Sequence, residues 1–456
     1  MAQESPRVGT EETAAPAAHR TASTPTAASD PAAASGPAPR ATTGPAAWFS
    51  VALGMFLVAV GANLFAPLLP VMREVHDLSQ AQVNFTLAIY VLGLVPALMV
   101  GGPMSDRKRR RAAVRPALLF SMAGTTVTLL AHLGTGGAAG PVLLVIGRLI
   151  TGIAVGLVLA AGASWLKEVT PASAGAGVAA RRATVATSAG FGMGPLVAGP
   201  VAEWIPGPDV TTLVVHLVLV LVCTPLIWTT PAPPPPAHAV AAGSGGTPRR
   251  PALIPATARQ PRFLASVASW APWAFGCATT SFAALAPVAA QAVGPNVAYT
   301  GVIAGITMLT GAFVQPWVGR HADSGRGPHP AVLGLGAATV GMLLAVLLCS
   351  LAPGTAAAWV MVPAAVVLGT AYGIMMVSGL REVQRIAPAE QLGALTAVFY
   401  ALTYVGFFVP FVIALLEPHT AYVPIFVFGA VVTVASIPLV IGATRGTRGP
   451  QVRQDG

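Results

Sequence analysis

Charged residues are scarce in this sequence. Only 9% of its 456 residues are Asp, Glu, Lys or Arg, whereas 54% are hydrophobic and the mean hydropathy is +0.72. A soluble domain carries about 25% charged residues. This scarcity excludes an ordinary soluble protein and favours a chain whose surface faces a lipid bilayer.

Lysine and cysteine are scarcer still. The only lysines are Lys108 and Lys167, and each of the three cysteines falls inside an apolar run. Their spacing fits neither metal ligands nor disulfides, so we expect small core residues and no metal or cofactor. The net charge of +10 does not indicate a nucleic-acid partner, because Lys and Arg form short clusters between apolar runs.

Twelve apolar runs are long enough to cross a membrane as helices. Gly and Pro inside them are tolerated in membrane helices. The seventh and eighth runs are separated only by residues 294–296, so that boundary is soft. The predicted spans are Trp48–Pro70, Val83–Val100, Ala113–Leu133, Val142–Leu166, Ala183–Trp204, Leu213–Trp228, Phe263–Val293, Val297–Val318, Val332–Leu351, Ala358–Val377, Leu392–Leu416 and Val423–Ile441.

These runs predict an all-α membrane protein made of two six-helix bundles. The first 45 residues are rich in Ala, Pro, Ser and Thr, which is typical of a disordered tail, and a similar stretch from Pro231 to Pro261 is typical of a flexible linker. The predicted organisation is a disordered tail at 1–45, an N-terminal bundle at 46–230, a linker at 231–262, a C-terminal bundle at 263–443 and a second tail at 444–456.

The basic residues predict the orientation. If the amino terminus is cytoplasmic, all but two of the 25 Lys and Arg residues lie in cytoplasmic segments. The exceptions are Arg73, on the outside, and Arg148, inside the fourth span. We therefore expect a multi-pass protein of the bacterial inner (cell) membrane with both termini in the cytoplasm.

The two halves carry an internal repeat. The same distance along the chain separates Asp106 from Asp323 and Gly152 from Gly369. It also separates Gly156 from Gly373, which follow those two glycines by four residues. Each half has an even number of spans, so duplicated halves run parallel and are expected to enclose a central cavity.

Four motifs carry a family resemblance: residues 61–70 at the end of the first span, 102–111 after the second, 146–152 in the fourth and 190–199 in the fifth. Over about Trp48 to Ile441 the sequence resembles the major facilitator superfamily, and specifically its twelve-span drug:proton antiporter branch. Two departures are Arg109 and Ala198, where the pattern has glycine. The resemblance implies alternating-access efflux of small amphipathic drugs or metabolites by proton antiport, a function associated with multidrug resistance.

The resemblance assigns a conformational clamp to the loop after the second span. Its acidic residue would contact the amino-terminal end of the eleventh span, where a helix dipole favours negative charge. The alternative is that the basic run from Arg107 to Arg111 only orients the protein. The clamp residues predicted on this basis are Gly102, Asp106, Arg107, Arg110 and, from the repeat, Asp323.

Proton or substrate coupling is assigned to Arg148, Glu203 and His216. A membrane arginine should face a cavity or a partner, although snorkelling to the headgroups is an alternative. All 15 acidic residues lie in loops, tails or span ends. Glu203, near the outer mouth of the expected cavity, is the first choice for a proton carrier, and His216 is the second. The alternative is an ordinary interfacial Glu203 and transport without protons.

The fifth span carries the antiporter motif, with Gly190, Gly194, Pro195 and Gly199. It predicts a helix bend that shapes the cavity, or a small-residue packing face, or both. Aromatic, polar and methionine side chains in other spans are cavity candidates, since an adaptable lining suits varied apolar ligands. They are Asn63, Asn84, Tyr90, Trp270, Trp273, Gln315, Tyr372, Met375, Met376 and Tyr404.

Three functions remain open. The favoured one is export of a small-molecule substrate in exchange for protons; the second is uptake of a small polar metabolite by a symporter or uniporter. The third is a membrane-embedded enzyme or sensor; an enzyme within the membrane needs clustered His, Asp, Glu or Cys in its spans, and the sequence shows no such cluster. The sequence also lacks a nucleotide-binding motif, so uphill transport must use an ion gradient. We expect a monomer that binds substrate, protons and the lipid bilayer.

Overall fold

Helices account for all the regular structure in the described part of the chain. The computed structural model describes residues 45–107, 111–133, 139–174, 177–230, 254–294, 296–324, 329–388 and 391–445. Twelve helical segments within these ranges are long and apolar enough to span a bilayer, which confirms the predicted number. A helix satisfies its own backbone donors and acceptors, and hydrocarbon offers no substitute for those bonds.

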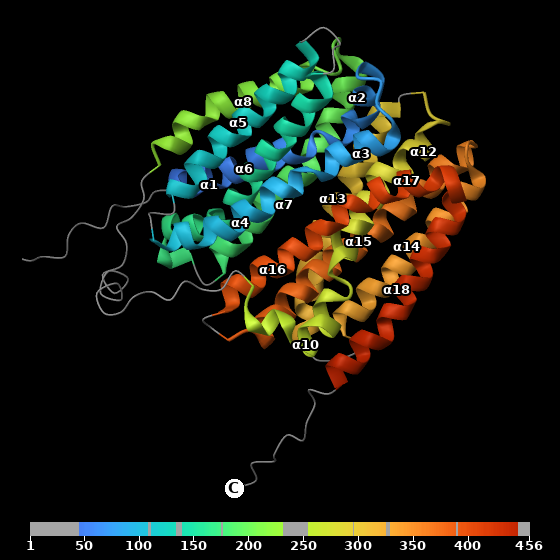
Figure 1. Ribbon diagram of the computed structural model, residues 1–456. Helices are drawn as coiled ribbons and strands as arrows, with labels where there is room; N and C mark the ends of the chain where they lie inside the picture. Colours follow the sequence, from blue (N-terminus) through green and yellow to red (C-terminus); the bar gives the residue numbers. More distant parts are fainter. Residues whose placement is uncertain are drawn as a thin grey trace, which may run out of the picture. The chain divides into compact units, whose positions relative to one another are not determined.

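The N-terminal bundle contains the first six spans (Figure 1). Its first two spans are each built from more than one helix, and the other four from one helix each. The elements are α1 (Pro45–Asn63), η1 (Ala66–Leu68), α2 (Leu69–Val75), α3 (Gln80–Ala88), α4 (Tyr90–Arg107), α5 (Arg111–Leu133), α6 (Ala139–Val169), η2 (Ala172–Ala174), α7 (Val178–Trp204) and α8 (Thr211–Trp228).

The C-terminal bundle contains the last six spans. Its seventh span is interrupted by two π-helical turns, η4 and η5, and its eleventh by a short 3-10 turn, η7. The elements are η3 (Ala256–Arg259), α10 (Pro261–Phe263), η4 (Leu264–Ala268), α11 (Ala271–Thr279), η5 (Thr280–Leu285), α12 (Ala286–Ala290), α13 (Asn296–Ser324), α14 (Pro330–Leu351), α15 (Thr355–Ile386), α16 (Leu392–Val405), η7 (Gly406–Phe408), α17 (Val409–Thr420) and α18 (Tyr422–Arg445).

Several helices extend beyond the apolar runs. The tenth span continues to Ile386 rather than ending at Val377, and the second begins at Gln80 rather than Val83. A capping box explains the second case, because the Ser79 hydroxyl accepts from the Gln82 N–H and the Gln82 side chain accepts from the Ser79 N–H. The end of the predicted linker is also ordered, as the Thr257 hydroxyl donates to Gln391 Oε1 at 2.8 Å.

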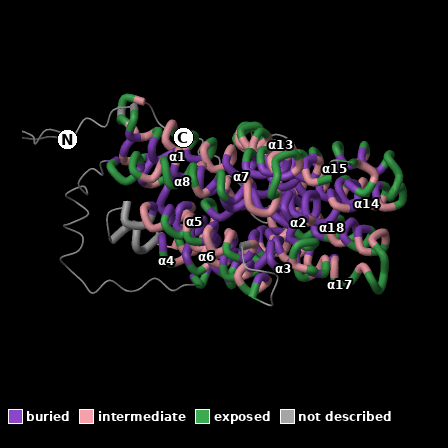
Figure 2. The backbone as a smooth tube through the Cα atoms, turned by 90° about the horizontal axis from the view of Figure 1, so that it is seen from above, coloured by how far each residue is buried: buried purple, intermediate pink, exposed green. Residues whose placement is uncertain are grey.

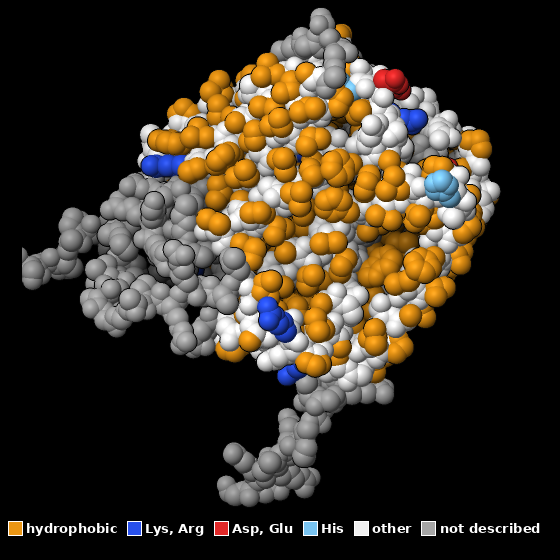
Figure 3. Space-filling model, viewed as in Figure 1, with side chains coloured by type: hydrophobic (Ala, Val, Ile, Leu, Met, Phe, Trp, Pro, Cys, Tyr) orange, Lys and Arg blue, Asp and Glu red, His pale blue; other side chains and the backbone are white. Residues whose placement is uncertain are grey.

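All the described helices belong to one compact unit. We call the end of the bundles at which α1 begins and α18 ends the terminal end, and the opposite end, where α2 ends and α13 begins, the distal end. In Figure 2 buried positions concentrate inside the bundles and where α7 meets α13. On the face drawn in Figure 3, hydrophobic side chains cover the broad middle region and charged side chains lie towards the ends.

Glycines let helices within each bundle approach at repeat-related positions. A Cβ added at Gly152 of α6 would overlap the Tyr90 carbonyl oxygen, and one added at Gly369 of α15 would overlap the Thr307 carbonyl oxygen. The next glycines of the pair, Gly156 and Gly373, lie equally close to backbone carbonyls of α4 and α13. The repeat in the sequence therefore corresponds to one packing arrangement that occurs in both bundles.

We predict that Gly152→Ala and Gly369→Ala each destabilise the protein by about 1–3 kcal/mol, because the added methyl group forces two helices apart. Gly336→Ala is the matched control, since no atom lies within 4 Å of its added Cβ and alanine is the better helix former. The measurement is the apparent melting temperature in detergent. Equal melting temperatures for Gly152→Ala and Gly336→Ala would contradict this packing.

Candidate functional site

An aromatic cluster lies between the two bundles midway along their spans. Tyr90 of α4 comes from the N-terminal bundle; Phe275, Tyr372, Tyr404 and Phe407 come from the C-terminal bundle. Ring centroids are 4.4 Å apart for Phe275 and Tyr404 and 4.9 Å apart for Tyr90 and Phe407. Such pairs contribute about 0.5–1.5 kcal/mol each beyond burial. The cluster fills the space between the bundles and separates two cavities.

The terminal cavity lies on the terminal side of this cluster and has a volume of about 200 Å³. Its walls come from both bundles and combine aromatic, methionine, aliphatic, hydroxyl and amide groups. The lining is Met55, Leu159, Ala163, Ala183, Thr184, Thr187, Ser188, Phe191, Phe275, Gln315, Tyr372, Met376, Val377, Leu380, Tyr400 and Tyr404. No charged side chain is among these residues, so the cavity suits a substrate that is largely apolar with a few hydrogen-bonding groups.

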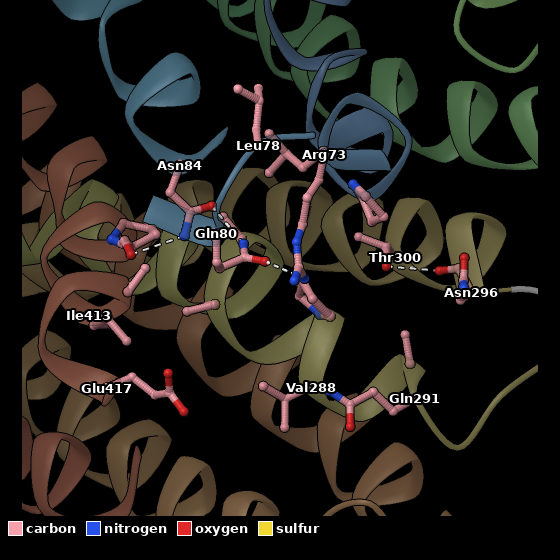
Figure 4. A pocket seen from close by; sticks show the side chains of 18 of the residues that line it. Arg73, Leu78, Gln80, Asn84, Val288, Gln291, Asn296, Thr300, Ile413 and Glu417 are labelled. Carbon is pink, nitrogen blue, oxygen red and sulfur yellow. Dashed lines mark hydrogen bonds between the residues drawn. The ribbon is translucent and has the colours of Figure 1, made fainter. Parts of the chain in front are cut away.

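The distal pocket lies on the other side of the cluster and has a volume of about 640 Å³ (Figure 4). Its lining combines apolar with polar side chains and includes one cation, Arg73. The other polar side chains are three acids, four amides and two hydroxyl groups: Glu74, Asp77 and Glu417; Gln80, Asn84, Gln291 and Asn296; Thr300 and Tyr422. The pocket therefore offers donors, acceptors and both signs of charge, in contrast to the terminal cavity.

A polar chain crosses the floor of the distal pocket from one bundle to the other. The Gln80 amide donates to Asn84 Oδ1 at 3.2 Å, and Asn84 Nδ2 donates to the Pro410 carbonyl oxygen of α17 at 3.0 Å (Figure 4). Asn84 is 1% exposed. A buried amide that lost this partner would leave an unsatisfied donor at a cost of about 1–3 kcal/mol. Asn84 thus holds the bundles together at this level.

A second polar contact joins the bundles at the distal end. Glu203, near the end of α7, accepts hydrogen bonds on Oε2 from the backbone N–H groups of Val297 and Ala298, at 2.9 and 3.1 Å. Both donors lie in the first turn of α13. The carboxylate caps otherwise unpaired N–H groups and faces the positive end of the helix dipole. We call this contact the distal latch.

Glycines of α7 bring the two helices of the latch together. A Cβ at Gly199 would lie 2.8 Å from the Gly301 Cα of α13. A Cβ at Gly194 would lie 2.8 Å from the Val60 carbonyl oxygen of α1. A Cβ at Gly190 would overlap the Phe56 carbonyl oxygen of the same helix. The α7 glycines therefore form a packing seam on two sides, one within the N-terminal bundle and one between bundles. Helix α7 continues through Pro195.

Comparison with known proteins identifies the fold. The sequence model described as the Major Facilitator Superfamily matches residues 51–411. This chain belongs to the Major Facilitator Superfamily. An uncharacterized MFS-type transporter of Mycobacterium tuberculosis (strain ATCC 25618 / H37Rv) is 25% identical over 415 residues, which cover 79% of this chain and 68% of the relative.

Solved structures with the same fold include transporters of this superfamily. The inward-open conformation of the xylose transporter XylE from E. coli superposes with a TM-score of 0.64 at 16% identity, covering 86% of this chain and 95% of that one. A D-xylose-proton symporter superposes with a TM-score of 0.62 at 17% identity, covering 88% and 97%. This chain is therefore a multi-pass membrane protein with a transporter fold.

In this superfamily member, Arg148 is buried and does not snorkel. It is 2% exposed, and its Nη1 and Nη2 donate to the carbonyl oxygens of Ala62 at 3.0 Å and Leu87 at 3.4 Å. The guanidinium carbon lies 4.6 Å from the ring centroid of Phe65 and 4.8 Å from that of Tyr90. Cation–π contacts of a desolvated arginine contribute about 2 kcal/mol. Arg148 thus reaches the aromatic cluster through Tyr90.

His216 lies inside the N-terminal bundle, away from both cavities. Its Nδ1 is 3.0 Å from the Thr125 hydroxyl and its Nε2 is 3.1 Å from the Leu57 carbonyl oxygen. One tautomer satisfies both contacts, with Nε2 donating and Nδ1 accepting. The ring also fills the space beside Gly61. Geometry therefore gives His216 a bridging role among α1, α5 and α8.

Only some residues of the predicted conformational clamp lie in the described part of the structure. Gly102, Asp106 and Arg107 lie in the last turns of α4, but their side chains, like Arg110 as a whole, lie outside the described part of the structure. Asp323 is described, and its carboxylate pairs with the Arg381 guanidinium of α15 at 2.6 and 3.2 Å. That partner belongs to the same bundle, so the contact links α13 to α15.

The predicted cavity residues divide among several places. Gln315, Tyr372, Met376 and Tyr404 line the terminal cavity and Asn84 the distal pocket, whereas Tyr90 belongs to the aromatic cluster. The others line neither cavity: Asn63, whose Nδ2 donates to the Phe191 carbonyl oxygen at 3.0 Å, and Trp270, Trp273 and Met375, which pack inside the C-terminal bundle. Helical phase explains these misses, since neighbours on one span face different sides.

Sequence reasoning missed a buried acid. Glu382 is 4% exposed near the end of α15, where it pairs with Arg262 at 3.7 Å and Arg385 at 3.3 Å. Burial lowers the pKa of the neighbouring His329, and the Glu382 charge opposes that shift. The prediction ended this span at Val377, which placed Glu382 in a loop. The spacing of Arg385 three residues after Glu382 was the available signal for a continuing helix.

We predict that Glu203→Ala opens the distal end. Losing the cap and its charge–dipole attraction costs about 1–2 kcal/mol, which shifts the closed-to-open ratio by about 5- to 30-fold. The measurement is the distance distribution between spin labels at Ile205 and Gln291 in a cysteine-free background. Glu74→Ala removes an exposed acid at the same end and should leave the distribution unchanged. Identical distributions for both variants would rule out the latch.

Proposed function

We propose that this transporter exports small amphipathic molecules from the cytoplasm by alternating access. The terminal cavity is the observation that carries the proposal, because its aromatic, methionine and hydroxyl lining contains no charged residue. Such a lining favours uncharged or weakly polar molecules of varied shape over sugars or ions. A substrate would load there and leave through the larger and more polar distal pocket.

The proposed direction depends on the orientation in the membrane. We place both termini in the cytoplasm of a bacterial cell, because Lys and Arg concentrate in the loops of the terminal end. The terminal cavity then faces the cytoplasm, and the distal pocket, with Arg73, faces the outside. In this arrangement the exporter acts as a monomer, with one substrate path between its two bundles.

Proton antiport is the proposed energy source. Neither the terminal cavity nor the aromatic cluster contains a carboxylate, so coupling acts through groups beside the path. Protonation of Glu203 would remove the negative charge that faces the first turn of α13, and the cap on α13 would weaken. Arg148 would stabilise the cluster electrostatically, and His216 is the alternative proton carrier. On the cytoplasmic side, Asp106 would clamp the bundles.

Uptake of a small polar metabolite is the second candidate. The distal pocket favours it, because amides such as Gln80, Asn84 and Gln291 are suitable partners for hydroxyl groups. The structural similarity to a D-xylose-proton symporter is in keeping with such a substrate. The two candidates predict opposite directions of net movement across the same membrane.

Transport in inverted membrane vesicles distinguishes the candidates. An exporter should accumulate a lipophilic fluorescent dye inside vesicles acidified by respiration, and a protonophore should abolish the accumulation. Tyr372→Leu should weaken dye affinity about two- to tenfold, since an aromatic contact is worth about 0.5–1.5 kcal/mol. Trp359→Leu is the control on the same helix, as Trp359 is 78% exposed. Dye accumulation unaffected by Tyr372→Leu would exclude the terminal cavity as the binding site.

Substrate-induced proton movement in proteoliposomes tests the coupling separately. The parent should release protons when substrate is added, and Glu203→Gln or His216→Ala should reduce that release without abolishing substrate binding. Transport by the parent without proton movement would exclude antiport. Proton release by both variants at the parent's level would exclude these two residues as carriers.

A further inference from the structure

A lateral groove lies between the amino-terminal parts of α1 and α7 at the terminal end. Its volume is about 430 Å³, and it is separate from the terminal cavity because α1 and α7 contribute different faces to each. One wall comes from α1 and the other from α7. The groove is lined by Trp48, Phe49, Ala52, Leu53, Phe56, Arg181, Arg182, Val185 and Ala186.

Most of the groove surface is apolar and open. Phe49 is 52% exposed and Val185 is 61% exposed. Both lie within the first eight residues of apolar helices long enough to span a bilayer, so we expect them near the level at which headgroups meet acyl chains. An apolar furrow at that depth is filled by hydrocarbon rather than by water, since about 25 cal/mol is gained per Å² of apolar surface covered.

Two arginines form the polar rim of the groove. The Arg182 guanidinium carbon lies 3.8 Å from the Trp48 ring centroid. This contact holds the guanidinium group over the groove wall. Arg182 Nη1 is buried and has no hydrogen-bond acceptor within the described part of the structure. Leaving a buried charged donor unpaired costs more than the 1–3 kcal/mol of a neutral one. An acceptor supplied from outside the chain would remove this cost.

Adjacent Arg181 adds a second charge at the same level. It is exposed, and no acidic side chain pairs with either arginine among the ion pairs of the described residues. Two guanidinium groups beside an apolar furrow are complementary to a phosphate group that carries an acyl chain. An amphiphile without an anionic group would leave both arginines unpaired, and a lipid with a net negative charge adds electrostatic attraction that a zwitterionic lipid lacks.

We propose that this α1/α7 groove binds an anionic phospholipid. Its acyl chain lies along Trp48, Phe49 and Phe56, and its phosphate accepts hydrogen bonds from Arg181 and Arg182. Basic residues at the membrane surface attract anionic lipids by about fivefold per residue. Because α7 also carries the distal latch and the glycine seam, the bound lipid contacts the helix that joins the two bundles.

Lipid binding to the purified full-length protein tests the site. The probes are dioleoylphosphatidylglycerol and dioleoylphosphatidylcholine, which share acyl chains and differ in headgroup charge; occupancy is measured by native mass spectrometry. The parent should prefer phosphatidylglycerol. Combining Arg181→Gln with Arg182→Gln should weaken its binding about 25-fold, since two basic residues are lost. Ala52→Phe, which fills the groove and keeps both charges, should also weaken it.

The matched control combines Arg259→Gln with Arg320→Gln, which removes two exposed charges at the same end and should leave phosphatidylglycerol binding unchanged. Equal losses in this control would overturn the proposal in favour of a general charge effect. So would competition by glycerol phosphate at the lipid's own concentration, because the site would then bind a soluble anion. If removing residues 1–44 raised phosphatidylglycerol binding tenfold or more, the amino-terminal segment would be the occupant and the proposal would fail.

Discussion

The close approach of α7 and α13 determines how the two bundles meet. Gly199 and Gly301 remove the side chains that would keep these helices apart, and Glu203 then reaches the first turn of α13. The seam and the latch depend on each other: without the glycines the carboxylate would lie too far from its donors, and without the carboxylate the first turn of α13 would keep unpaired N–H groups. The bundle arrangement at the distal end follows from this pair.

The terminal cavity and the distal pocket differ in the side chains that line them. The bundles touch along α7 and α13, along α3 and α17, and at the aromatic cluster. Space remains on either side of the cluster; its lining contains no charged residue towards the terminal end and contains Arg73 and three acids towards the distal end. In a bilayer the few charged groups within spans must find a polar partner or reach water. Arg148 donates to two backbone carbonyl oxygens, whereas the distal acids line an open pocket.

Patterns that follow from the bilayer itself were predictable from the sequence: the number of spans, the two bundles and the buried environment of Arg148. Contacts that depend on helical phase were not. The sequence placed Glu203 at the outer end of its span, yet nothing in it indicated that Val297 and Ala298 would lie opposite. Glu382 was missed because an apolar window ends before the helix does. The role of a residue such as Glu203 depends on how the two bundles pack against each other, and the sequence does not specify that packing.

Cross-linking across the distal interface tests most directly whether these contacts break during transport. The rings of Phe85 and Phe411 lie 5.4 Å apart on α3 and α17, so cysteines at both positions in a cysteine-free background can be joined by a short reducible bifunctional reagent. The account predicts that the cross-link stops transport, that reduction restores it, and that either single cysteine treated alike has no effect. Undiminished transport by the fully cross-linked protein would contradict it, because the distal end would then never need to open.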